Sequence, residues 1–228
     1  MNAQDPNVAS VELVAHALGE LCEELVLVGG CAVGLLITDP ARPSVRATQD
    51  VDLIAEVTSL GNYYNLQQKL KDRGFQEQGD VICRWRKDVL IVDVMPAEEI
   101  GLGFSNRWYP LAVQYAQHLT LPSRTVIRIV NAPLFIATKL ESFQGRGEGD
   151  YGHHDIEDIV NLVDGRKELL DEVASSDQAV REYIQQEIED LLADELFTEQ
   201  LPWHLHPDPS NQARATLLIE RLRKLAGL

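Results

Sequence analysis

The sequence predicts a protein of the α/β (α+β) class, with strands and helices alternating over the first 130 residues and helices alone after them. Two apolar runs that end at a glycine pair or a proline, residues 25–28 and 89–95, are typical of buried strands. Residues 8–23 instead repeat their apolar side chains at helical spacing. At 228 residues, the chain is long enough for a core domain with a helical extension.

The first half begins with the predicted helix at 8–23 and the strand at 25–28. Gly29-Gly30 forms a turn in which backbone N–H groups can approach a ligand closely, and a helix is expected to open from it at 31–37. The loop 38–49 then leads to the next strand. The remaining elements expected in this half are a strand at 50–54, a helix at 62–73 that ends before Gly74, a hairpin of strands 81–85 and 89–95, a short helix at 107–117 and a strand, suited to a sheet edge, at 125–130.

The second half carries only helical patterns. Pro133 suits the first turn of a helix that continues over 134–143, and the glycine-rich stretch 144–152 predicts a loop. The other helical segments expected are 155–163, 167–197 and, after a break at 202–209, residues 211–225.

Two carboxylates separated by one residue open the strand at 50–54. Because strand side chains alternate between faces, Asp50 and Asp52 are expected to point the same way. Asp93 is a lone carboxylate within the apolar strand at 89–95, and it needs a partner because burying an unpaired charge is costly. If the two strands are neighbours, three carboxylates converge, and such a group can hold two divalent ions roughly 3.5–4 Å apart.

Composition narrows the classes of function. The net charge is −16, so any surface that binds nucleic acid over many phosphates must be local. The three cysteines are widely spaced and flanked by apolar residues, which favours buried thiols over disulfides or a zinc site. No apolar run of about 18 residues and no signal-peptide pattern are present, so we expect no membrane partner and a cytoplasmic location.

Taken in order, these motifs resemble those of the polymerase-β-type nucleotidyltransferase superfamily, and within it the abortive-infection branch, which includes toxins of bacterial toxin–antitoxin pairs. The resemblance spans residues 25–163. The residues that carry it are Val28-Gly29-Gly30, Arg46-x-Thr48-x-Asp50-Val51-Asp52, the helix with Lys139, and Asp155-Ile156-Glu157-Asp158-Ile159. The interval between Gly30 and Asp50 is longer than in the shortest forms of the superfamily, which leaves the fine shape of the nucleotide pocket open.

The resemblance implies a mixed β-sheet flanked by helices, with residues 1–130 as the catalytic core and residues 131–228 as a helical region that completes the cleft. It implies that Asp50 and Asp52 bind two Mg²⁺ ions and that Asp93 binds the catalytic one. Gly29 and Gly30 would present amides to the triphosphate of an NTP. Lys139 would contact the β- or γ-phosphate. Asp158 or, as the second choice, Asp155 would face the cleft as a catalytic residue and position Lys139 or the acceptor. Arg46 would contact phosphate or the start of the acidic strand.

The implied activity is transfer of a nucleoside monophosphate from an NTP to an acceptor, with release of pyrophosphate. The family suggests RNA, such as a tRNA end, as acceptor and an antitoxin as partner, whereas the acidity of the chain favours a small molecule, a protein hydroxyl or RNA held by a narrow basic rim. The alternatives are an aminoglycoside-type nucleotidyltransferase, whose acidic surface would suit a polycationic acceptor, and a nucleotide-binding module with little turnover.

Each motif also has a purely structural interpretation. The glycine pair can be a plain strand-to-helix turn, and Asp50 and Asp52 can be a turn cap and a surface acid. Asp93 can pair with an arginine such as Arg84 or Arg86. Lys139 can be an ordinary helix residue, and Asp155 and Asp158 can be a solvated face or charges of a first helical turn. The nucleotidyltransferase hypothesis therefore depends on the joint occurrence of the motifs.

Overall fold

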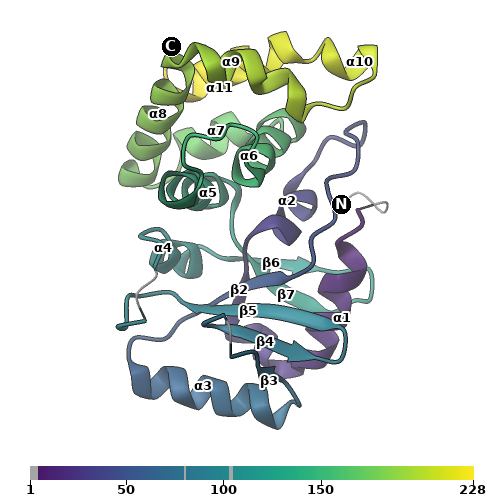
Figure 1. Ribbon diagram of the computed structural model, residues 1–228, viewed down its shortest axis with the longest axis vertical. Coiled ribbons are helices and arrows are strands. Elements are labelled where there is room, and N and C mark those ends of the chain that lie inside the picture. Colours follow the sequence, from purple (N-terminus) through teal and green to yellow (C-terminus); the bar gives the residue numbers. More distant parts are fainter. Residues whose placement is uncertain (1–4, 80, 103–104) are drawn as a thin grey trace. The chain divides into compact units, whose positions relative to one another are not determined.

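The protein consists of two compact units, seen in a computed structural model that describes residues 5–79, 81–102 and 105–228 (Figure 1). The sheet unit contains residues 5–35 and 46–131, and the helical unit contains residues 36–45 and 132–228. In the described ranges, no helix combines the length and the apolar character that crossing a membrane requires.

A seven-stranded mixed sheet forms the centre of the sheet unit, as the sequence predicts. Its strands are β1 (Leu25–Leu27), β2 (Val51–Ala55), β3 (Gln76–Glu77), β4 (Arg84–Lys87), β5 (Leu90–Pro96), β6 (Gln117–Thr120) and β7 (Val126–Ile129). They lie in the order β3-β4-β5-β2-β1-β7-β6. The β2–β5 and β1–β7 pairs are parallel and the other pairs are antiparallel.

Helices cover this sheet. They are α1 (Val8–Leu18), followed by the 3₁₀ turn η1 (Gly19–Glu23), α2 (Gly30–Leu36), α3 (Leu60–Asp72) and α4 (Tyr109–Gln114). Val14 and Leu18 of α1 border the same small apolar pocket as Val51 and Leu53 of β2. This apolar face is the one opposite to the face on which Asp52 lies, because side chains alternate along β2.

The helical unit is built from the segment 36–45 and the C-terminal helices. The helices are α5 (Ala132–Arg146), α6 (His154–Gly165), α7 (Leu169–Ala174), α8 (Gln178–Ala193), α9 (Glu195–Gln200), the 3₁₀ turn η2 (Leu201–His204), α10 (Pro209–Gln212) and α11 (Ala215–Leu225). Within the unit, α5 packs on α6 and α8, and α11 packs on α6 and α8. Helix α5 is apolar on nearly all sides, and ten of its residues are buried.

Several boundaries differ from the sequence-based expectation. The strand predicted at 81–85 begins three residues later, because a turn that includes Cys83, with a φ of 68°, precedes it. The helix predicted at 107–117 is shorter, since β6 begins at Gln117. Strand β7 is not an edge strand, because β6 covers its outer side. The helix predicted at 134–143 extends to Arg146, so the glycine-rich loop is shorter than expected.

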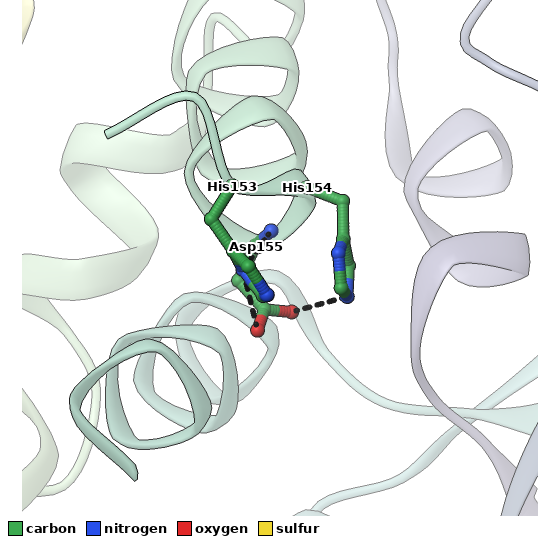
Figure 2. A group of neighbouring side chains, drawn as sticks. All are labelled: His153, His154 and Asp155. Carbon is green, nitrogen blue, oxygen red and sulfur yellow. Dashed lines mark hydrogen bonds and ion pairs between the residues drawn. The ribbon is translucent and has the colours of Figure 1, made fainter. Parts of the chain in front are cut away.

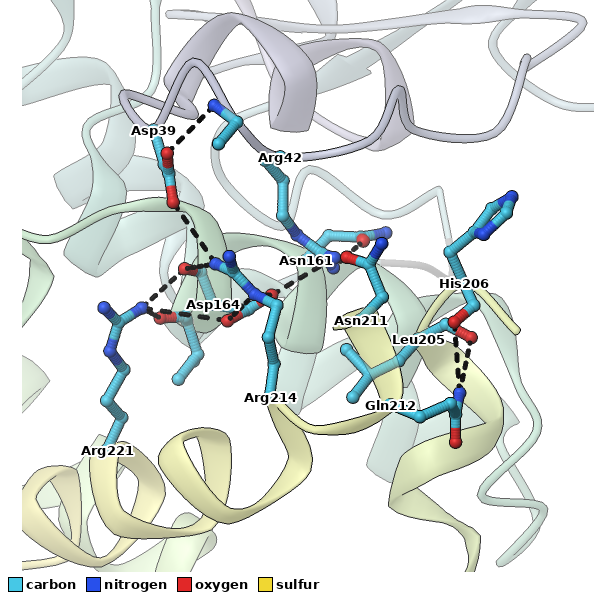
Figure 3. Close-up of polar contacts among 12 residues, drawn as sticks. Asp39, Arg42, Asn161, Asp164, Leu205, His206, Asn211, Gln212, Arg214 and Arg221 are labelled. Carbon is cyan, nitrogen blue, oxygen red and sulfur yellow. Dashed lines mark hydrogen bonds and ion pairs between the residues drawn. The ribbon is translucent and has the colours of Figure 1, made fainter. Parts of the chain in front are cut away.

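A buried charge cluster ties the segment 36–45 to the rest of the helical unit (Figure 3). Asp164 of α6 is fully buried, and its Oδ2 lies 3.1 Å from Nη1 of Arg42 and 2.9 Å from Nε of Arg214. Nη2 of Arg42 also donates to Oδ1 of Asn161 over 2.7 Å, and Nη2 of Arg214 lies 3.2 Å from Oδ2 of Asp39. Buried charges of this kind are tolerated only when each one is paired.

Candidate active site

The three candidate acids of the sheet unit lie together, on neighbouring strands. Strand β5 pairs with β2 in parallel, and the register places Asp93 directly beside Asp52. Asp50 immediately precedes β2, two residues before Asp52, and so it lies on the same face. The adjacency of the two acidic strands that the sequence predicted is therefore present.

Arg84 of β4 bridges two of these acids. It is the cross-strand partner of Asp93, and it binds that carboxylate at two points, with Nε 2.8 Å from Oδ1 and Nη2 2.7 Å from Oδ2. The same Nη2 also donates to Oδ2 of Asp50 over 2.6 Å. The hydrogen bond to Asp93 raises the pKa of the Arg84 guanidinium still further, so this cation is permanent.

Asp52 lies against the glycine turn at the end of β1. Gly29 has a φ of 67°, and a Cβ atom at that position would collide with the Asp52 carboxylate. Only glycine meets both conditions, because it alone adopts this backbone conformation readily and has no side chain. Gly30 follows as the first residue of α2. The turn and the acid thus form one compact feature.

A small polar network holds the segment before β2 in place. Asn7 is buried, and its Oδ1 accepts the Thr48 N–H over 2.9 Å while its Nδ2 donates to the Arg46 carbonyl over 3.0 Å. The Thr48 hydroxyl lies 2.8 Å from Sγ of Cys31 in α2. The Cys31 thiol is also 3.3 Å from the Asp50 carbonyl. These contacts fix the backbone of Asp50, and they give Thr48 a positioning role.

In the helical unit, Lys139 binds two candidate acids. Its Nζ lies 2.9 Å from Oδ1 of Asp155 and 2.7 Å from Oδ2 of Asp158. Both carboxylates are buried, and Lys139 is only 5% exposed. Lys139 is therefore neither an exposed helix residue nor a solvated cation, and Asp155 and Asp158 are not solvated charges of a helix start.

Asp155 has the most contacts in this cluster, and Figure 2 shows it beside His153 and His154. Nε and Nη2 of Arg146 each donate to one of its oxygens over 2.9 Å. Nδ1 of His153 accepts the Asp155 backbone N–H over 3.2 Å and so caps α6, and Nε2 of His154 lies 3.8 Å from Oδ1. Ligand atoms of the two histidines and Asp155 lie within 4.8 Å of one another. A metal ion there would meet two competing cations, so this cluster fits an ion-pair core better than a metal centre.

The charges around Asp155 predict an acid-labile contribution to stability. Burial alone would raise the pKa of Asp155, but Arg146 and Lys139 outweigh it and lower the pKa from 3.8 to about 2. A carboxyl with a lowered pKa stabilises the fold above its unfolded pKa, and this stability is lost as the pH falls towards 2. We expect a loss of about 2 kcal/mol between pH 5 and pH 2. A ¹³C NMR titration of the Asp155 carboxyl checks this, and a midpoint at or above 3.8 would contradict it.

The candidate residues thus form two groups, one in each unit. The sheet unit brings together Asp50, Asp52 and Asp93 with the turn at 29–30. The helical unit brings together Lys139, Asp155 and Asp158. Arg46 belongs to the sheet unit, where its carbonyl accepts a hydrogen bond from Nδ2 of Asn7. Sequence reasoning named Arg84 as a possible partner of Asp93 but missed its contact with Asp50.

The register of the hairpin was the missing signal for Arg84. Lys87 pairs with Leu90, so only Asp88 and Val89 form the turn. Three residues further from the turn on each strand, Arg84 lies opposite Asp93. The sequence predicts this hairpin with the polar stretch 86–88 as its turn. With that turn, Arg84 would not lie opposite Asp93, so the contact was missed.

The donor set of the sheet unit fits divalent magnesium. Carboxylate oxygens are the ligands that Mg²⁺ prefers, and three of them share one face of the sheet. Nη2 of Arg84 occupies the position of a cation between Asp50 and Asp93. An ion shared by Asp50 and Asp93 would need the place that this nitrogen holds, so its binding requires a movement of Arg84.

Comparison with known proteins identifies the fold. No protein-family model matches the chain, and no curated protein matches it. An antigenic nucleotidyltransferase-like protein from Paracoccidioides brasiliensis has 19% sequence identity and a TM-score of 0.50, and the match covers 88% of this chain and 93% of that chain. A proposed nucleotidyltransferase from H. pylori has 11% identity and a TM-score of 0.49, with 100% and 96% of the two chains covered. The match to the Paracoccidioides protein identifies the fold as nucleotidyltransferase-like.

Proposed function

We propose that the protein is a metal-dependent nucleotidyltransferase, which transfers a nucleoside monophosphate from an NTP to an acceptor and releases pyrophosphate. The observation that carries this proposal is the position of Asp50, Asp52 and Asp93 on one face of β2 and β5, beside the glycine turn. A nucleotidyltransferase-like fold supports it. Three clustered carboxylates are costly without cations, and a binding-only protein has no need of them.

In this proposal Asp50 and Asp52 hold two Mg²⁺ ions, and Asp93 holds the catalytic one. When bound, the ions neutralise the charge that develops on the attacking oxygen and on the leaving pyrophosphate. Asp93 orients the acceptor hydroxyl towards the α-phosphate and favours the loss of its proton. Asp52, fixed against Gly29, sets the position of the phosphates relative to the glycine turn.

Roles are also proposed for Lys139 and Asp158. Lys139 would contact the β- or γ-phosphate as a compact cation. Asp158 lies 2.7 Å from Lys139 Nζ, which suits a residue that positions this lysine. Gly29 and Gly30 would offer backbone amides to the triphosphate, and Arg46 would add a further phosphate contact.

The acceptor divides the proposal into two forms. RNA, such as a tRNA end, is the acceptor that the resemblance to toxin–antitoxin nucleotidyltransferases favours, and an antitoxin would then be a partner. The net charge of −16 favours instead an aminoglycoside-like polycation, which an acidic surface would attract. The alternative of a nucleotide-binding module with little turnover is favoured by one observation, the Arg84 contacts that already balance part of the acidic charge.

Transfer of label from α-³²P-labelled NTPs tests the proposal. The purified protein is incubated with each NTP, Mg²⁺ and cell extract, and the products are separated into RNA, protein and small molecules. Label in RNA supports the tRNA-like form, and label in a small molecule supports the aminoglycoside-like form. Label in no fraction, at saturating Mg²⁺ and with every NTP, would overturn the transferase proposal.

A further inference from the structure

Arg84 takes a place among the candidate acids that a bridging metal ion would need. One nitrogen, Nη2, lies 2.6 Å from Oδ2 of Asp50 and 2.7 Å from Oδ2 of Asp93. These are two of the three carboxylates that the proposed function assigns to the metals. A Mg²⁺ ion lies about 2.0–2.1 Å from its oxygen ligands. A Mg²⁺ ion bound by both of these oxygens and the Arg84 nitrogen therefore cannot occupy the space between them at the same time.

The guanidinium is a strong competitor for this position. Its two parallel hydrogen bonds to Asp93 have the bidentate geometry that makes arginine–carboxylate pairs strong. Arginine keeps its charge throughout the usable pH range. The competition therefore cannot be relieved by loss of a proton, and a divalent ion can enter only if the side chain moves.

The surroundings of Arg84 allow such a movement. The side chain of Arg84 is 25% exposed, and that of Asp50 is 32% exposed, so the bridge lies at the surface of the sheet unit. Its strand, β4, is flanked on the outer side only by the two-residue strand β3. Rotation of the side chain towards solvent breaks its three carboxylate contacts and leaves the backbone pairing of β4 with β5 intact.

We propose that Arg84 is a built-in counter-cation, which holds Asp50 and Asp93 together in a metal-free resting state and which divalent ions must displace. The inference rests on the proposed function, because it assumes that these acids bind metal. Its consequence is that Arg84 weakens the affinity for divalent ions. Until metal, or metal with nucleotide, is present, Arg84 keeps the two acids paired and offsets the repulsion between their charges.

Binding of Mn²⁺ measures this competition without any turnover. The free Mn²⁺ signal in electron paramagnetic resonance is followed during titration of the wild type, Arg84→Gln and Arg86→Gln. Arg86 is the matched control, because it lies on the same strand and its Nε donates to the Asp88 carbonyl over 3.2 Å. We expect Arg84→Gln to bind Mn²⁺ about ten-fold or more tightly than the wild type, and Arg86→Gln to match the wild type.

The outcomes separate this inference from the proposed function. Equal or weaker Mn²⁺ affinity in Arg84→Gln, with binding by the wild type, would overturn the counter-cation and leave the metal site standing. No saturable Mn²⁺ binding by either protein, or binding that Asp52→Asn leaves unchanged, would overturn the metal site itself and the inference with it.

A second measurement on the wild type covers the case in which Arg84→Gln does not fold. The Nε–H signals of the arginine side chains are recorded by ¹H–¹⁵N NMR during titration with Mg²⁺, and the Arg84 signal is assigned with Arg84→Lys. We expect the Arg84 signal to shift to a solvent-exposed position as Mg²⁺ binds, while the Arg86 signal stays in place. An Arg84 signal that stays unchanged at saturating Mg²⁺ would overturn the inference.

Discussion

Asp52→Asn is expected to reduce label transfer by about a thousand-fold or more while the protein stays folded. The substitution removes one negative charge from the proposed metal ligands and keeps the size of the side chain. Metal ions supply several kcal/mol of charge stabilisation to such transition states, and each 1.4 kcal/mol is a factor of ten in rate. The measurement is the initial rate of transfer from α-³²P-labelled NTP at saturating Mg²⁺, with circular dichroism to confirm the fold.

Asp72→Asn provides the matched control. Asp72 ends α3, is exposed and accepts a hydrogen bond from Gln68, so its charge has no role in the proposed site. This variant should transfer label at the wild-type rate. Equal rates for Asp52→Asn and Asp72→Asn would remove Asp52 from the metal ligands.

Asp164→Asn is expected to have the largest effect on stability. The buried carboxylate contacts Arg42 and Arg214, and the Arg42 side chain is only 3% exposed. Asparagine leaves the buried Arg42 guanidinium without its ion-pair partner, whereas Arg214 keeps its contact with Asp39. Breaking a buried ion pair from one side costs about 3–5 kcal/mol. The free energy of unfolding in urea, followed by circular dichroism, measures the loss.

The comparison for Asp164 is Asp171→Asn in α7. Asp171 is exposed, and a surface substitution of this kind changes the free energy of unfolding by about 0.5 kcal/mol or less. If Asp164→Asn costs no more than this control, the buried cluster does not stabilise the helical unit.

Much of the sheet was predictable from the chain alone, because its central strands are apolar runs with clear boundaries. β2 and β5 are examples. Alternation was enough to place Asp50 and Asp52 on one face, whereas the position of Asp93 beside Asp52 depends on the pairing of the two strands. β3 and β6 were missed, because β3 is two residues long and both strands consist mostly of polar, exposed residues. Such strands form through pairing with a neighbour, and local sequence carries little sign of it.

The candidate site was predictable as a set of acids but not as a set of contacts. Regular alternation gave the shared face, and the glycine pair gave the turn on which Asp52 packs. The Arg84 bridge depends on a register that shifts with one residue of turn length, so it needed the structure. For Lys139, the resemblance implied one carboxylate neighbour, Asp158 or Asp155. That both bind it is seen only where α6 packs against α5.

The Arg42–Asp164 pair bears on how this protein can be divided into pieces for separate expression. A gene fragment that encodes only residues 132–228 contains Asp164 and Arg214 but omits Arg42 and Asp39. A complementary fragment that stops at residue 131 carries Arg42 without Asp164 and Asn161, its two contacts in α6. An intact helical unit therefore requires the ten residues 36–45 and residues 132–228 in one chain, for instance in a circularly permuted order.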